Sequence, residues 1–185
     1  MQIKFQQSPN YTKSKGIAKL GFTLHGTLGA YQGAVNWLGM TSAQRGGTPP
    51  SSAHYVIGRN EGEVTQLVKN EDISWHCGKP VNPKPRAKWL IPKNILGQYK
   101  SVNDHFIGIE FATMYDMDKD GKIKPNEKTL TDWQYKCALE IINSSGIKNP
   151  KLLSHQEICD YKSDDMYFAV LKLTSMLLNQ RDAIQ

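Results

Sequence analysis

The sequence predicts an α/β fold: one domain in which a mixed central β-sheet is flanked by helices. Three kinds of segment support this prediction. They are short apolar runs rich in strand-forming residues, a β-hairpin, and amphipathic helices separated by Gly- and Pro-rich turns. The 185 residues suffice for a single domain, residues 1–185, with a sizeable core, and they contain no internal repeat or low-complexity segment.

The first predicted strand covers residues 19–26, KLGFTLHG, and ends at His25. Thr27 is the predicted N-cap of a helix over residues 30–38, because apolar residues recur there every three or four positions. A Gly-, Pro- and Ser-rich loop follows at 41–52, and we expect this loop to lie near a functional site.

The middle of the chain predicts a β-hairpin and then a surface excursion. Apolar runs at 54–57 and 64–68 flank the turn residues 59–62, as in a hairpin. A short segment at 72–78 leads into residues 79–102, which contain four prolines. We expect this long stretch to run over the surface of the same domain.

The last part of the chain predicts a strand and two helices. The apolar run 105–112, HFIGIEFA, is interrupted only by Glu110, which suits a central strand with one carboxylate facing a cleft. Thr131 is the predicted cap of a helix over 131–145, and residues 165–180 form a final amphipathic helix.

Composition and charge narrow the functional classes. Hydrophobic residues make up 39% and charged residues 22% of the chain, and no apolar run approaches the roughly 20 residues of a membrane span. The N-terminus lacks an apolar signal core, so we expect synthesis in the cytoplasm without a signal peptide. The net charge of +6 favours polyanionic surroundings: nucleic acid, anionic lipid or a cell wall. The basic residues are spread along the chain, with a mild cluster at 79–100.

The three cysteines argue against a disulfide framework. They are an odd number, contain no CxxC pair, and by default are reduced thiols: Cys77, Cys137 and Cys159.

Residues 152–165, LLSHQEICDYKSDD, hold the densest set of reactive side chains. His155 ends an apolar run, so it is expected where a short strand leaves the core. In an extended segment Lys162 and Asp164 would point the same way, back toward His155. An imidazole and a carboxylate are two parts of a zinc site, and a nearby lysine can stabilise an oxyanion. This spacing alone does not specify a metal site, which needs a third ligand from elsewhere in the chain.

Five segments, in order and over nearly the whole chain, resemble the zinc-dependent N-acetylmuramoyl-L-alanine amidases of the type-2 amidase and peptidoglycan-recognition-protein family. The segments are LHGT at 24–27, SSAHYVIGRNEGEVTQLV at 51–68, SWHCG at 74–78, IGIEF at 107–111, and SHQEI with K-S-D at 154–164. Five ordered matches are far more specific than any one motif. The resemblance implies the mixed-sheet fold of that family.

The resemblance also implies a metal centre with one Zn²⁺ held by His25, His155 and Asp164. Asp165 is the neighbouring candidate for the carboxylate. Two imidazoles and one carboxylate leave a fourth position for water, as a catalytic zinc requires. Taken singly, a histidine at a strand end is more often structural than a ligand, so the ligand assignment of His25 and His155 depends on the matched segments.

Two further residues receive catalytic roles from the resemblance. Glu110 would be the general base or would orient the water, and Lys162 would stabilise the tetrahedral oxyanion. Some relatives carry a tyrosine just before the histidine that matches His54, whereas this chain has Ala53, so the acid–base role falls to Glu110. The alternative is that Glu110 is a buried carboxylate paired with Lys162.

Three residues are predicted to line a substrate groove: His54, Trp75 and His76. The alternative for His54 is packing in the core, and the alternative for His76 is a surface hairpin position. Cys159 lies near the proposed centre and could compete for zinc, although a small buried filler is the preferred interpretation.

A calcium-loop pattern is independent of the family. Residues 116–127, DMDKDGKIKPNE, fit the template D-x-D-x-D-G-x5-E. The four oxygen donors would be Asp116, Asp118, Asp120 and Glu127. The alternative is a solvated turn, because an apparent strand rather than a helix precedes this loop.

These observations predict a peptidoglycan amidase, a monomer that acts as a phage-type endolysin without a separate wall-binding domain. It would reach the cell wall after membrane permeabilisation. The alternatives are a cytosolic amidase that recycles anhydro-muropeptides, and a non-catalytic peptidoglycan-recognition module, which would not need the full set of ligands and catalytic residues. A nucleic-acid binder is disfavoured, because the sequence contains no recognition helix or aromatic–basic platform.

Overall fold

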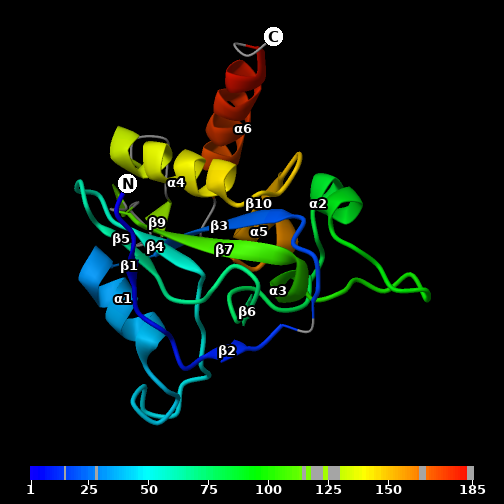
Figure 1. Cartoon of the computed structure of the whole chain (residues 1–185). Coiled ribbons are helices and arrows are strands. Elements are labelled where there is room, and N and C mark those ends of the chain that lie inside the picture. Colours follow the sequence, from blue (N-terminus) through cyan, green and yellow to red (C-terminus); the bar gives the residue numbers. More distant parts are fainter. Residues whose placement is uncertain are drawn as a thin grey trace.

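The computed structural model describes residues 1–14, 16–27, 29–113, 116–117, 123–124, 130–162 and 166–182 (Figure 1). The strands are β1 (Lys4–Phe5), β2 (Tyr11–Thr12), β3 (Gly21–Thr27), β4 (Tyr55–Ile57), β5 (Val64–Gln66), β6 (Ile73–Ser74), β7 (Phe106–Ala112), β8 (Asp116–Met117), β9 (Ile123–Lys124) and β10 (Lys151–Ser154). The helices are α1 (Tyr31–Gly39), α2 (Pro85–Leu90), α3 (Val102–His105), α4 (Asp132–Ser144), α5 (His155–Ile158) and α6 (Tyr167–Asp182).

A six-stranded sheet with the order β1-β5-β4-β7-β3-β10 forms the centre of the fold. The strands β4, β7, β3 and β10 run parallel to one another, whereas β4 and β5 are antiparallel. The prediction of a mixed central sheet flanked by helices is therefore confirmed. The predicted hairpin at 54–68 is confirmed as the β4–β5 pair.

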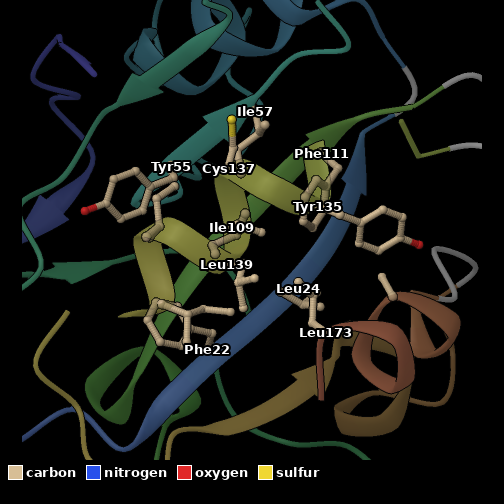
Figure 2. Close-up of a cluster of buried hydrophobic side chains, with 14 of the residues drawn as sticks. Phe22, Leu24, Tyr55, Ile57, Ile109, Phe111, Tyr135, Cys137, Leu139 and Leu173 are labelled. Carbon is tan, nitrogen blue, oxygen red and sulfur yellow. The ribbon is translucent and has the colours of Figure 1, made fainter. Parts of the chain in front are cut away.

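The two faces of the sheet differ because side chains alternate along a strand. Phe22 and Leu24 of β3, with Ile109 and Phe111 of β7, point toward α4 and α6 and build the main core (Figure 2). Their neighbours His25 and Glu110 must then belong to the opposite face. The apolar residues that pack against α4 and α6 thus determine which residues of β3 and β7 lie on the other face of the sheet.

The opposite face is covered by shorter elements and leaves room for polar side chains. The helix α1 packs Val35 and Leu38 against Val56 of β4. The elements α2, α3 and α5 share a third cluster that includes Phe106 and Leu153. This face of the sheet, which carries His25 and Glu110, is thus bordered by α1, α2, α3 and α5.

Helix α4 begins as the sequence predicts. Thr131 is its N-cap and forms a capping box with Gln134, whose backbone N–H donates to the Thr131 side chain over 3.3 Å. The predicted cap at Thr27 is wrong, because Thr27 is the last residue of β3 and pairs with Ala112 of β7. Helix α1 begins after Ala30 without a side-chain cap.

The predicted calcium loop has no support in the described part of the chain. The strand β7 leads into residue 116, where an EF-hand would need a helix, and the backbone of Asp116 itself lies in β8, which pairs with β9. The other three predicted donors, Asp118, Asp120 and Glu127, lie outside the described residues.

Among the described helices, none combines the length and the apolar character that crossing a bilayer requires.

Candidate active site

Three parallel strands bring predicted site residues together at the carboxyl ends of the strands. In the pairing of β3 with β7, His25 lies opposite Glu110. On the other side of β3, Ser154 of β10 lies opposite Leu24, so the next residue, His155, reaches the level of His25. The carboxyl ends of parallel strands are the usual location of functional sites in such sheets.

His155 is held in place by the short helix α5 that it begins. The Ser154 N–H donates to the Glu157 carboxylate over 2.9 Å, and Arg86 of α2 forms two 2.7 Å hydrogen bonds with the same carboxylate. Arg86 Nη2, which makes one of these two bonds, also donates to the Leu152 carbonyl on β10 over 2.9 Å. This buried carboxylate therefore ties the start of α5 to β10 and α2, which fixes the direction of His155.

The two predicted histidine ligands face each other. The Nδ1 atoms of His25 and His155 are 2.9 Å apart, and both side chains are buried. Burial lowers the pKa of His25 well below its usual value, and the neighbouring His155, His76 and Lys162 lower it further. His25 is therefore neutral, which is the form that binds a metal.

A third histidine, His76, sets the tautomer of His25. Its Nε2 lies 3.2 Å from the Phe106 carbonyl, which can only accept, so Nε2 carries the proton. Burial lowers the pKa of His76 well below its usual value, so its Nδ1 carries no proton and accepts from His25 Nε2–H over 3.0 Å. The remaining nitrogen of neutral His25, Nδ1, then presents its lone pair toward His155. A hydrogen bond of this kind from the far nitrogen is typical of metal-binding histidines.

Gly108 leaves the space that the His76 ring needs in order to contact His25. A Cβ at position 108 would lie 2.7 Å from His76 Cγ and 3.0 Å from its Cβ and Cδ2. A side chain here would therefore displace the His76 ring that contacts His25. The structure thus gives His76 a place behind His25, and it is buried rather than exposed on a groove wall.

His54 is also buried, with none of its surface exposed. Its Nδ1 accepts from the Gly108 N–H and faces the Ser74 hydroxyl, at 2.9 and 2.8 Å, and its Nε2 lies 3.1 Å from the Asp72 carbonyl. Burial lowers the pKa of His54 to about 3, with a smaller contribution from Lys19. These hydrogen bonds of His54 connect β4, β6 and β7.

The remaining predicted site residues are Lys162, Trp75 and the two aspartates. Lys162 is half-buried, and its charge acts on His25 strongly enough to lower that pKa. Trp75 is half-buried and donates its Nε1–H to the Thr12 hydroxyl over 3.0 Å, which leaves its groove role a prediction. Asp164 and Asp165 lie outside the described residues.

The structure also reveals a second donor set that shares His155. One ligand atom each from Cys77, His155 and Cys159 lie within 4.8 Å of one another, so these three could hold a metal ion. Hydrogen bonding to Cys77 and then to His155 lowers the pKa of Cys159 to about 4, against the effect of burial. Cys159 was foreseen as a competitor for zinc, but its partner Cys77 was not.

Backbone contacts between two loops bring these cysteines together. The N–H of Val81 donates to the Ile158 carbonyl over 3.2 Å, and the Asp160 N–H donates back to the Val81 carbonyl over 3.3 Å. The sequence contained one local indication that Cys77 lies near the site, because Cys77 directly follows His76 in SWHCG. Nothing in the sequence indicated that residues near 80 lie beside residues near 159.

Comparisons with known proteins identify the family and the fold. The family described as N-acetylmuramoyl-L-alanine amidase, Amidase_2, matches residues 19–167. Over 70 residues the chain is 36% identical to N-acetylmuramoyl-L-alanine amidase A of Achromobacter lyticus. That match covers 38% of this chain and 36% of the relative, so it spans little more than a third of the relative's length.

Three solved structures share the fold. A selenomethionine derivative of AmpD superposes with a TM-score of 0.57 at 20% identity, over 89% of this chain and 87% of that chain. AmpDh3 from Pseudomonas aeruginosa, in complex with anhydromuramic pentapeptide, gives a TM-score of 0.56 at 18% identity, over 91% and 63%. The catalytic domain of XlyA gives 0.52 at 15% identity, over 99% and 96%.

Proposed function

Because the chain belongs to the N-acetylmuramoyl-L-alanine amidase family, we propose that it is a zinc-dependent peptidoglycan amidase. Its substrate bond would be the amide between N-acetylmuramic acid and the L-alanine of the stem peptide. The single observation that carries this proposal is the pair of buried imidazoles, His25 and His155, with Glu110 paired beside His25 at the open end of the sheet.

The described residues fit a zinc ion. Two nitrogens that share a tetrahedral zinc at about 2.0–2.1 Å lie about 3.3 Å apart, so the 2.9 Å between the two Nδ1 atoms needs to open only slightly. The neutral state of His25 and the hydrogen bond to its Nε2 support the same role. We assign the third position to Asp164, by its place in the matched K-S-D segment. When bound, zinc lowers the pKa of a water molecule toward about 7 and polarises the scissile carbonyl.

The protein residues would supply proton transfer and charge. The Glu110 carboxylate accepts a proton from the attacking water and delivers it to the nitrogen of the leaving alanine. The Lys162 ammonium stabilises the negative charge that develops on the scissile carbonyl oxygen. Its electrostatic effect on His25 supports a position close enough to the site for this role.

We place the enzyme among phage-type endolysins that act on polymeric cell wall once the membrane has been permeabilised. The net positive charge supports an anionic wall as the setting. A recycling amidase would instead prefer soluble anhydro-muropeptides, the kind of ligand named for AmpDh3. Trp75 is the residue we propose for the substrate groove, because it is half-buried next to His76.

The test measures zinc content and peptide release from purified peptidoglycan for the native chain and for Glu110→Gln. This isosteric change should keep zinc but reduce the rate at least 100-fold, which is the usual range for loss of a general base. Release of peptides with N-terminal alanine confirms the bond. Activity confined to soluble anhydro-muropeptides supports recycling, and wall binding without any release identifies a recognition module instead.

A further inference from the structure

The three most exposed large hydrophobic side chains of the described residues lie in the last turn of α2 and in the segment between α2 and α3. Their exposed fractions are 87% for Trp89, 101% for Ile95 and 78% for Leu96. This segment extends away from the sheet as a separate projection (Figure 1). Isolated exposed apolar residues are common, but three at one projection indicate an interaction surface.

The stretch from β6 to the start of α3, which includes the projection, carries the net charge of the protein. Residues 73–103 contain six lysine or arginine residues and no acidic residue, whereas the rest of the chain carries 17 basic and 17 acidic residues. Arg86 is paired with Glu157, and the five lysines are exposed. They are Lys79, Lys84, Lys88, Lys93 and Lys100. The sequence suggested only a mild cluster here, but this segment accounts for the whole excess of +6.

The tip of the projection is held by its own hydrogen bonds. The Asn94 side chain accepts from the N–H groups of Leu96 and Gln98 over 3.0 and 2.9 Å, and Asn94 N–H donates to the Gln98 carbonyl over 2.8 Å. Gly97 adopts a φ of +76°, which other residues rarely tolerate, and closes the turn. Ile95 and Leu96 are therefore presented outward by a defined turn, and little ordering is needed when they are buried by a partner.

We propose that the 79–102 loop, which contains this projection, docks on the surface of an anionic lipid bilayer. A bilayer interface accommodates tryptophan and aliphatic side chains, while acidic headgroups attract lysines. A soluble polyanion would satisfy the lysines but would leave Ile95 and Leu96 in water. A neutral protein groove would bury the apolar residues but would gain nothing from five lysines. The combination of both features selects a negatively charged apolar surface.

This inference goes beyond the amidase proposal and does not depend on it, because membrane binding needs neither zinc nor substrate. If both hold, the 79–102 loop would retain the enzyme at the boundary between membrane and wall. None of the residues of this loop belongs to the proposed catalytic set.

The experiment is co-sedimentation of the full chain with vesicles of phosphatidylcholine, with and without phosphatidylglycerol. We expect binding only to the acidic vesicles, and binding that weakens as salt is raised. Ile95→Ser with Leu96→Ser should reduce the partition coefficient at least tenfold. Each of Lys88→Gln and Lys93→Gln should reduce it about fivefold.

The matched control is Leu171→Ser with Leu178→Ser, which removes two exposed leucines from α6, 54% and 52% exposed. This control should bind like the native chain, and thermal unfolding should show all variants folded. The proposal is overturned by absence of binding to acidic vesicles, or by equal binding of the Ile95/Leu96 double variant. It is also overturned if heparin, a lipid-free polyanion, binds equally well and insensitively to that double change, or if the change instead abolishes a dimer in solution.

Discussion

Gly108→Ala is the most informative single substitution, because one added methyl group tests the hydrogen bond between His76 and His25. The added Cβ would lie 2.7 Å from His76 Cγ, in a place enclosed by strand β7 and the buried ring. Overpacking of this kind costs about 1–3 kcal/mol of folding free energy. Displacement of His76 would also break its 3.0 Å hydrogen bond with His25. Loss of a partner behind a metal ligand lowers metal affinity or activity about 10–100-fold.

The assay combines urea unfolding of the metal-free protein with a zinc competition titration. Gly33→Ala is the matched control: Gly33 lies in α1, and a Cβ there would contact nothing within 4 Å. This control should gain about 0.5–1 kcal/mol in stability and keep its zinc affinity.

The double variant Gly108→Ala with His76→Ala separates the two effects. Removal of the ring relieves the overlap, so stability should recover relative to Gly108→Ala, whereas zinc affinity should stay low. The reasoning is refuted if Gly108→Ala retains native zinc affinity, or if the double variant recovers both properties.

Three further predictions concern stability. Burial lowers the pKa of His54 to about 3, so between about pH 6.5 and pH 3 this side chain is protonated in the unfolded chain but not in the folded chain. The free energy of unfolding should therefore be highest above about pH 6.5 and fall as the pH is lowered toward 3. Between pH 7 and 4.5 the metal-free native chain should lose about 2–3 kcal/mol more than His54→Gln in urea unfolding, and an equal loss would contradict this. Thr131→Ala should cost about 1 kcal/mol in thermal unfolding by loss of the α4 cap, while Thr131→Ser should be near neutral, and equal effects would exclude a capping role. Arg86→Met leaves the buried Glu157 carboxylate without its bidentate partner, so chemical unfolding should show a loss of about 3 kcal/mol, and zinc binding should weaken. Unchanged zinc binding would argue against a role of Arg86 in fixing His155.

Much of the scaffold could be predicted because its signals are local. The alternation of apolar residues in FTLH and FIGIEF places one set in the core and leaves His25 and Glu110 for the other face, whatever the strand order. The capping box at Thr131 likewise depends on residues three positions apart. The cap at Thr27 failed because pairing with Ala112, a residue far along the chain, extends β3 through it.

The parts of the site that could not be predicted depend on contacts between distant segments. His76 reaches His25 only because Gly108 leaves space on a neighbouring strand. Patterns of nearby residues in the sequence cannot predict such a contact between distant positions. Cys77 and Cys159 meet because residue 81 pairs with the chain beside residue 159. The same holds for His54, whose partners Asp72 and Gly108 come from two other segments.

X-ray absorption at the zinc edge tests the central claim most directly, because it distinguishes the two donor sets that share His155. If zinc is held by His25, His155 and a carboxylate, its nearest neighbours are only nitrogen and oxygen, at about 2.0–2.2 Å. Zinc held by Cys77, His155 and Cys159 would instead show a sulfur shell at about 2.3 Å. We expect the spectrum of the zinc-loaded native chain to contain no sulfur shell. A shell of two sulfurs would contradict this assignment and would show that Cys77 and Cys159 bind the zinc.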